Sequence, residues 1–276
     1  MHMALIPRSG QNIARENNMY DTFSNDYDRF VNWDGRLAYE MPFIERLLAP
    51  LSTTQPARVL DAACGTGMHA IELAKRNHLA SGADLSSAMI ARAVENANQA
   101  GVVVTFKSAG FGALAEAFQT TGISRFDALL CLGNSIPHLL TRPDLDRTLV
   151  DFAACLREGG LLLIQNRNFD AVLAAQERWM EPQAYREDER EWIFLRFYDY
   201  TPDGLINFNI ITLFRLQGEP WQQKVESTRL CPWSHQELTA AVEAAGFTDI
   251  HLYGDMTGSP YQPLSSGNLI LTASVR

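Results

Sequence analysis

Two glycines and an aspartate lie at the ends of predicted strands, a position from which side chains and main chain can bind a nucleoside. Gly65 and Gly67 follow a short apolar run at 58–62 and precede an amphipathic stretch that begins at Met68. Glycine lets the main chain turn tightly and pass close to a ligand, and the first N–H groups of a following helix lack partners inside it. Asp84 lies 19 residues after Gly65, where a carboxylate can accept hydrogen bonds from both ribose hydroxyls. The pattern predicts a nucleoside-containing ligand; a plain helix cap is the alternative role for Asp84.

The glycines by themselves leave the type of nucleoside open. Dinucleotide sites read G-x-G-x-x-G, or G-x-G-x-x-A in a looser form, and place a pyrophosphate at the helix N-terminus. The run 65–70 reads GTGMHA, which passes the looser form. A dinucleotide and another nucleoside-containing cofactor are therefore both compatible with this loop.

The elements around these residues alternate between strand and helix. Buried strands are predicted at 58–62, 79–84, 102–106, 126–132 and 161–165. Helices are predicted at 37–50, at 68–76, at 86–101 and from 141 to the glycine pair at 159–160. Such alternation implies an α/β fold with a doubly wound parallel sheet covered on both faces. Ligands bind at the carboxyl ends of the strands in such sheets.

The pattern changes after the fifth strand. Three aromatic or β-prone runs at 191–200, 205–216 and 224–230 predict antiparallel strands within an insertion at about 185–232. A helix follows with a capping box that starts at Ser234, and runs at 250–253 and 268–275 would complete the main sheet as a hairpin. We expect an arm at residues 1–35 and the main domain at 36–276.

Composition restricts the class of partner. The 276 residues are 46% hydrophobic and 20% charged, with a net charge of −9, which argues against nucleic acid and anionic membranes as partners. No apolar run approaches the roughly 18 residues that span a bilayer. The four cysteines form no CxxC pair and no metal-ligand spacing, which predicts reduced, mostly buried thiols and no metal site. We expect a cytoplasmic protein that acts on a small molecule.

Several segments resemble one family. Residues 61–67 (DAACGTG) resemble motif I of class I S-adenosylmethionine-dependent methyltransferases, and 84–86 (DLS) resemble their ribose-binding motif II. Residues 131–139 (CLGNSIPHL) and 164–170 (IQNRNFD) are similar to the LGNSxxHL and RN[YF]D patterns of the glycine/sarcosine N-methyltransferase branch. The resemblance covers roughly 20–276. It implies a Rossmann-like seven-stranded sheet with a terminal β-hairpin reversal and a small antiparallel β insertion after the fifth strand.

The resemblance also implies roles for three residues beside the methyl acceptor. Arg167 would clamp the acceptor's carboxylate, Asn134 would lie near the acceptor, and His138 would lie against the cofactor. A guanidinium suits the first role because it binds a carboxylate through two parallel hydrogen bonds. An ordinary surface arginine and a merely packed histidine are the alternatives for Arg167 and His138.

The remaining expected contacts are with S-adenosylmethionine. Residues 20–33 resemble the family's cofactor-covering arm, so Tyr27, Trp33 and Arg36 are expected at the methionine end. Only Ser108 offers a side chain to the adenine edge after the third strand, so Leu85 and Phe111 are expected to stack on the ring. The other expected contacts are Asp61, Ala63, Gly65, Gly67, Asp84, Met89, Ala109, Gly110 and Leu132.

The implied activity is methyl transfer from S-adenosylmethionine, which becomes S-adenosyl-L-homocysteine, to the amine of a small carboxylate-bearing acceptor such as glycine or sarcosine. The alternatives are an oxygen or carbon nucleophile as acceptor, a non-catalytic cofactor-binding module, and a nicotinamide oxidoreductase. The sequence leaves open the identity of the acceptor, the number of methyl groups added and homo-oligomer formation. It also leaves open whether the β insertion is a lid and whether the aromatic run 192–200 packs or forms an acceptor cage.

Overall fold

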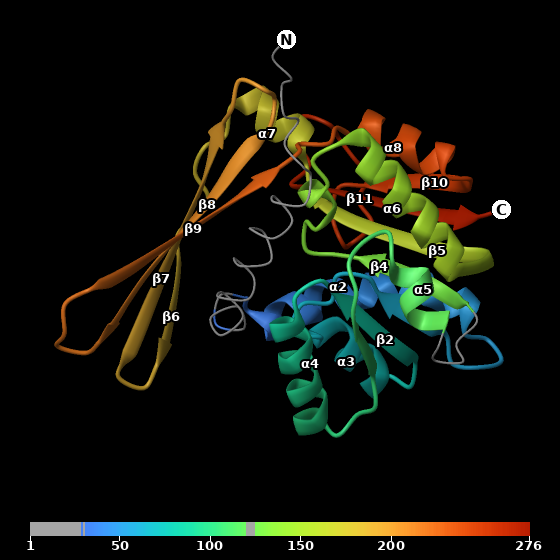
Figure 1. The fold of residues 1–276 in the computed structure, drawn as a ribbon, viewed down its shortest axis with the longest axis horizontal. Helices are drawn as coiled ribbons and strands as arrows, with labels where there is room; N and C mark the ends of the chain where they lie inside the picture. The colour runs from blue at the N-terminus through green and yellow to red at the C-terminus, as the bar shows by residue number, and fades with distance from the viewer. Residues whose placement is uncertain (1–28, 30, 120–124) are drawn as a thin grey trace, which may run out of the picture.

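The structure is a computed structural model that describes residues 29, 31–119 and 125–276. Two sheets organise these residues (Figure 1), one of seven strands in the order β10-β11-β5-β4-β1-β2-β3 and one of four in the order β6-β7-β8-β9. The larger sheet carries the helices, and the smaller one extends from it. Tyr27 lies outside the described residues.

The seven-stranded sheet has the topology that the sequence predicted. Its strands are β1 (Arg58–Asp61), β2 (Leu79–Asp84), β3 (Thr105–Ser108), β4 (Phe126–Cys131), β5 (Leu156–Arg167), β10 (Phe247–Tyr253) and β11 (Asn268–Val275). β1 to β5 pair in parallel, whereas β11 is antiparallel to both β5 and β10. The predicted hairpin reversal is confirmed. The strand order reverses between β1 and β4, and a crevice at the carboxyl ends of those strands is the usual ligand site.

Helices cover both faces of this sheet. One face carries α2 (Trp33–Leu48), α3 (Met68–Lys75) and α4 (Ser87–Ala100), and the other carries α5 (Leu114–Gln119), α6 (Arg142–Cys155) and α8 (His235–Ala244). Each layer buries its own apolar cluster, represented by Ile44 of α2 and by Phe152 of α6. The sheet and its two helix layers therefore form a doubly wound core. None of the helices described is at once long and apolar enough to cross a bilayer.

Local signals set the ends of several helices. The Asn32 side chain accepts the Gly35 N–H at 3.1 Å, so α2 begins at Trp33 and crosses the boundary expected at residue 35. The capping box predicted at Ser234 is present, with Glu237 as its partner. Such caps are worth about 0.5–2 kcal/mol to the helices that they begin.

Two of the wrongly predicted boundaries are explained by strand pairing. The helix expected to reach residues 159–160 ends at Cys155, and β5 begins at once because Leu156 pairs with Phe126 and its carbonyl accepts a hydrogen bond from Arg125 at 2.8 Å. The third strand is Thr105–Ser108 rather than 102–106, because its pairing partners on β2 end at Asp84. Tertiary pairing outweighed the local apolar pattern at both places.

The insertion contains one strand more than the sequence predicted. It comprises β6 (Gln183–Glu187), β7 (Arg190–Tyr200), β8 (Ile206–Leu216) and β9 (Gln222–Leu230), all antiparallel. Every residue of β6 is exposed, so no alternation of burial marks it. Trp192, Phe194 and Tyr198 of β7 are buried in apolar clusters, which favours packing over an acceptor cage for the aromatic run.

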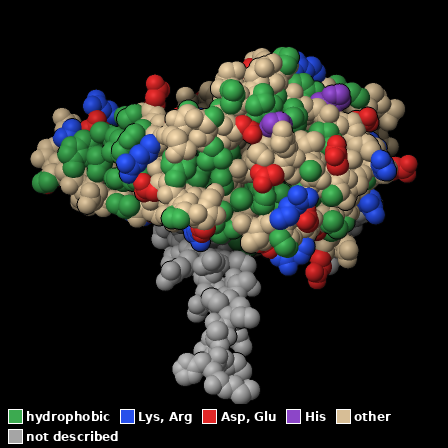
Figure 2. Space-filling model, turned by 90° about the horizontal axis from the view of Figure 1, so that it is seen from above, with side chains coloured by type: hydrophobic (Ala, Val, Ile, Leu, Met, Phe, Trp, Pro, Cys, Tyr) green, Lys and Arg blue, Asp and Glu red, His purple; other side chains and the backbone are tan. Residues whose placement is uncertain are grey.

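The smaller sheet also carries much exposed apolar surface. Figure 2 shows hydrophobic side chains gathered over the end of the molecule that this sheet forms. Its exposed large apolar residues on or next to the strands are Trp179, Tyr185, Leu216, Trp221 and Val225. The sheet joins the main domain through α7 (Phe169–Ala175), which follows β5 directly.

Candidate active site

The predicted glycine loop is a close-packed turn between β1 and α3. Gly65 and Gly67 have φ angles of +52° and +83°, which favour glycine. A Cβ at Gly67 would lie 2.8 Å from the Phe106 ring and 2.9 Å from the Cβ of Ala93. The Cys64 N–H donates to a β2 carbonyl at 2.8 Å, which fixes the loop against the sheet. Glycine is therefore required here by packing as well as by backbone conformation.

Asp84 links this loop to the next helix. Its Oδ2 accepts the Gly65 N–H at 2.9 Å and its Oδ1 accepts the Ser86 N–H at 2.9 Å. The helix-cap alternative is wrong, because the N-cap of α4 is Ser86, whose side chain accepts the Met89 N–H. A carboxylate oxygen can accept more than one hydrogen bond, which suits the expected contact of Asp84 with a ribose.

Asp61 ends β1 below the same loop. It is 2% exposed, and its Oδ1 has no hydrogen-bond partner among the described residues. Burial raises the pKa of Asp61 to about 6, although nearby His69 and Arg36 oppose the shift. A buried acceptor without a partner is costly unless a ligand supplies one. The ammonium group of the cofactor's methionine end would satisfy it.

A buried network that sequence reasoning missed holds Arg36. Its Nε donates to both oxygens of Glu40 at 3.1 Å, and Glu40 Oε2 lies 2.6 Å from Nε2 of His69. Burial raises the pKa of Glu40, but the His69 hydrogen bond and the Arg36 charge outweigh it and keep that pKa below its usual value. The rings of Trp33 and His69 meet edge to face, with their centroids 5.6 Å apart. The i, i+4 spacing of Arg36 and Glu40 on one helix was the sequence signal from which their ion pair could have been predicted.

This network brings Arg36 to the loop after β4. Its Nη2 lies 3.5 Å from where a Cβ on Gly133 would stand. The guanidinium therefore lies near the carboxyl ends of β1 and β4, as Asp61 does. The expected place of Arg36, near the carboxylate of the cofactor's methionine end, suits this geometry.

The expected adenine contacts surround the loop after β3. Leu85 is 47% exposed, and a Cβ on Gly110 would lie 2.8 Å from its Cδ1, so the backbone must pass close by. The Ala109 N–H donates to the Asp84 carbonyl at 3.0 Å. Phe111 packs edge-on against a core phenylalanine at 5.4 Å. Leu85 therefore offers more free surface for stacking than Phe111 does.

The remaining expected cofactor contacts follow the carboxyl ends of β1, β2 and β4 along the chain. Met89 and Leu132 are buried, at 1% and 3% exposure, while Ala63 is half-buried. His138 ends a short 3-10 helix, η2 (Ile136–His138), after β4. Burial lowers the pKa of His138 to about 4, so the imidazole is neutral at physiological pH.

Asn134 and Arg167 are brought together by the pairing of β4 with β5. Asn134 has a φ of +66°, and its Oδ1 accepts the Arg167 N–H at 2.9 Å. The Gly133 N–H next to it donates to the Gln165 side chain at 2.8 Å. The side-chain oxygen of Asn134 therefore fixes the main chain that carries the guanidinium.

The Arg167 side chain meets charged groups that the sequence did not indicate. Its Nη2 lies 2.9 and 2.8 Å from the two carboxylate oxygens of Glu177. Arg196 of β7 is close as well: burial lowers the pKa of Arg196, and the positive charge of Arg167 adds to that effect. Glu177 lies 10 residues after Arg167, beyond α7, and Arg196 lies 29 residues after it on β7, so no helix or strand spacing pointed to either.

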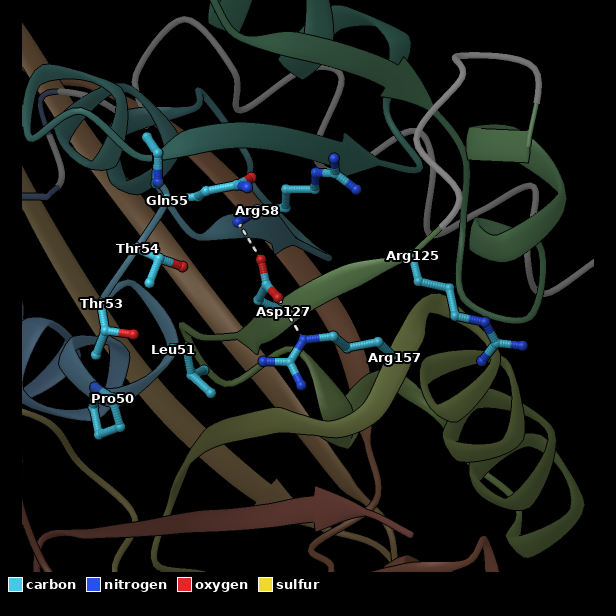
Figure 3. A pocket seen from close by; sticks show the side chains of 10 residues that line it. Pro50, Leu51, Thr53, Thr54, Gln55, Arg58, Arg125, Asp127 and Arg157 are labelled. Atoms are coloured by element: carbon cyan, nitrogen blue, oxygen red, sulfur yellow. Dashed lines mark hydrogen bonds and ion pairs between the residues drawn. The ribbon is translucent and has the colours of Figure 1, made fainter.

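An open hollow lies elsewhere, away from these residues. It has a volume of about 630 Å³ and is lined by Arg58, Asp127 and Arg157 among others (Figure 3). Asp127 accepts from the Arg58 N–H at 2.8 Å and from the Arg157 Nε at 2.5 Å. Arg58 and Asp127 stand at the amino ends of β1 and β4, the edge opposite the glycine loop. Within the described ranges, no cluster of three or more His, Cys, Asp or Glu residues could hold a metal ion.

Sequence comparisons point to methyl transfer. Residues 59–160 match the family model described as "Methyltransferase domain". Over 247 residues, the chain is 28% identical to a glycine/sarcosine N-methyltransferase of Aphanothece halophytica, covering 90% of this chain and 86% of that relative. It is 33% identical over 153 residues to a glycine/sarcosine N-methyltransferase of Halorhodospira halochloris. That match covers 55% of this chain and about half, 54%, of the relative.

Solved structures share the fold. A S-adenosylmethionine-dependent methyltransferase from Clostridium acetobutylicum superposes with a TM-score of 0.72 at 17% identity, covering 93% of this chain and 98% of that one. CalS10, an amino pentose methyltransferase from Micromonospora echinaspora with S-adenosylmethionine bound, gives a TM-score of 0.61 at 17% identity with full coverage of both chains. At such identities the likeness shows the architecture and not the acceptor.

Proposed function

We propose that this chain, which is a S-adenosylmethionine-dependent methyltransferase, transfers the methyl group to the amine of a small acceptor that carries a carboxylate, such as glycine or sarcosine. The observation that carries the proposal is the position of Arg167 at the carboxyl end of β5, with its main chain held by Asn134. Relatives that bear the glycine/sarcosine name support it at modest identity. The acceptor is the part of the proposal that needs a test.

Side chains near the carboxyl ends of β1 and β2, together with Arg36 of α2, could contact each part of the cofactor. We assign the ribose to Asp84, the ammonium to Asp61, the methionine carboxylate to Arg36 and one adenine face to Leu85. The Oδ1 of Asp61, which has no partner within the described part of the chain, and the turn at Gly67, where a Cβ would clash, support this placement. When bound, S-adenosylmethionine supplies a methyl group already activated on a sulfonium.

The protein's own contribution to the reaction is alignment. Because the leaving group is preactivated, no protein nucleophile is needed, and holding the amine in line with the methyl group can contribute about 7–11 kcal/mol. Arg167 would fix the acceptor by its carboxylate, which directs the amine to one place. A site closed to water also lowers the pKa of the acceptor's ammonium, so that its nitrogen presents a lone pair.

We also propose that residues 1–35 cover the cofactor and that residues 36–276 form the methyltransferase domain. The guanidinium of Arg29 lies 4.8 Å from the Trp192 ring centroid and pairs with Glu187 at 3.2 Å. The described end of the arm therefore contacts the smaller sheet. This contact supports a joint cover made by the arm and the insertion.

Affinity for S-adenosylhomocysteine should rise as pH rises through about 6. The ligand's ammonium needs an ionised Asp61, whose pKa of about 6 in the free protein means that acid removes the charge. Groups that face Asp61 are His69, Arg36 and Asp84. Calorimetry from about pH 5 to 7.5 would measure this rise. Asp61→Asn keeps the shape of the side chain and should make the affinity nearly independent of pH. An equal dependence of affinity on pH in both proteins would show that Asp61 does not bind the ammonium.

The proposed function is tested by radiolabelled methyl transfer. Glycine, sarcosine, dimethylglycine and isopropylamine are offered as acceptors in separate reactions. We expect label in glycine or sarcosine and none in isopropylamine, which lacks the carboxylate. Product mass spectrometry counts the methyl groups added. Transfer only to a hydroxyl or carbon nucleophile, or cofactor binding without transfer to any acceptor, would contradict the proposal.

A further inference from the structure

The proposed carboxylate clamp already faces a carboxylate of its own chain. Nη2 of Arg167 lies 2.9 and 2.8 Å from Oε1 and Oε2 of Glu177, and both side chains are 36% exposed. The pair therefore lies at the surface of the site, where a small acceptor can reach it. Glu177 therefore binds the same guanidinium, that of Arg167, to which we assign the acceptor's carboxylate.

The fold holds Glu177 in this place. α7 ends at Ala175, and Gln176 then takes a left-handed conformation with a φ of +50° that turns the chain back. The Glu177 N–H donates to the Val172 carbonyl at 3.0 Å, and the Tyr200 O–H donates to the Glu177 carbonyl at 2.6 Å. The contact with Arg167 is thus set by α7 and β7 together.

The geometry of the pair makes Glu177 a competitor. A guanidinium grips a carboxylate by two parallel hydrogen bonds along an edge made of Nε and Nη2 or of Nη1 and Nη2. Both edges share Nη2, the nitrogen that both Glu177 oxygens contact. An acceptor that takes either edge fully needs one of the two Nη2 hydrogens, so it must displace or shift Glu177.

Charge around the pair still attracts an anion. Arg196 of β7 lies close enough to Arg167 for the two charges to interact. Burial raises the pKa of the neighbouring Tyr198 to about 12, so this phenol stays neutral. Two guanidiniums and one carboxylate leave one net positive charge while Glu177 is in place.

We propose that Glu177 is an internal competitor that occupies Arg167 until the acceptor's carboxylate displaces it. The proposal rests on the proposed function, because it requires Arg167 to bind that carboxylate. A carboxylated amine is held at both ends, by Arg167 and by its amine at the cofactor, whereas acetate is held only by Arg167. Internal competition weakens both ligands, and the ligand with a single attachment then fails to occupy the clamp.

Glu177→Gln tests this, because it removes the charge and keeps the shape. An exposed pair of this kind is worth about 0.2–1 kcal/mol, so the KM for the acceptor should fall by up to about 5-fold, with kcat nearly unchanged. The inhibition constant of acetate against the acceptor should fall in parallel. Glu243→Gln on α8, which packs against α6 and β10, is the charge-matched control and should change neither constant.

The outcomes separate the two proposals. An unchanged acceptor KM in Glu177→Gln overturns the competition, and a raised KM would mean that Glu177 instead positions Arg167. Calorimetry with S-adenosylhomocysteine shows that the variant is folded and binds the cofactor. If the wild type methylates no carboxylated amine, the proposed function fails and this inference falls with it. An active wild type with an unchanged variant overturns this inference alone.

Discussion

Replacing Asp84 by alanine should weaken the binding of S-adenosylhomocysteine by about 100-fold or more. Hydrogen bonds to a charged group are worth about 1.5–3 kcal/mol each, and we assign two ribose hydroxyls to this carboxylate. The same carboxylate also accepts the N–H groups of Gly65 and Ser86, so its loss loosens the loop as well. Isothermal titration calorimetry measures the effect directly.

The control for Asp84 is the asparagine variant. Asp84→Asn keeps one acceptor oxygen and the side-chain volume, so it should lose less affinity than Asp84→Ala. Thermal unfolding without ligand distinguishes a loosened loop from a misfolded domain. Unchanged affinity in a folded Asp84→Ala protein would show that the ribose binds elsewhere.

Arg167→Ala should raise the KM for the acceptor by about 100-fold while cofactor affinity stays nearly the same. Two parallel charge-assisted hydrogen bonds at about 1.5–3 kcal/mol each account for that magnitude. The cofactor is unaffected because its assigned contacts come from β1, β2 and α2, whereas Arg167 ends β5. Steady-state kinetics over the acceptor, with calorimetry for S-adenosylhomocysteine, measure both quantities.

Arg167→Lys separates charge from geometry. A lysine keeps the positive charge but cannot form the two-pronged contact, so its KM should lie between those of the wild type and Arg167→Ala. Equal kinetics in wild type and Arg167→Ala would remove the clamp from the mechanism. A loss of cofactor affinity would place Arg167 in the cofactor site instead.

Much of the fold could be predicted because its signals are local. The strand Leu79–Asp84, the capping box at Ser234 and the terminal strand Asn268–Val275 all occur where the apolar pattern and the turn residues placed them. The errors fell where pairing to a distant strand set the limit. β5 starts at Leu156, ahead of two glycines that look like a helix stop, because β4 is there to pair with it.

The site divides in the same way. Gly65, Gly67 and Asp84 were predictable, since a tight turn and a fixed spacing along one strand–helix–strand unit place them together. The role of Glu40 was not predictable, because it depends on the contacts of the buried carboxylate with His69 and Arg36. Tyr27 lies outside the described residues, so its expected role stays a prediction.

The amino-acid sequence by itself determined the doubly wound sheet, its hairpin reversal and the glycine loop beside which we place the nucleoside. Each of these follows from short-range periodicity, glycine conformation and strand-end position. Only the tertiary structure decided which charges meet at the sheet edge. Glu177 and Arg196 reach Arg167 through the turn after α7 and the register of β7, and such contacts depend on packing between segments that no local pattern relates.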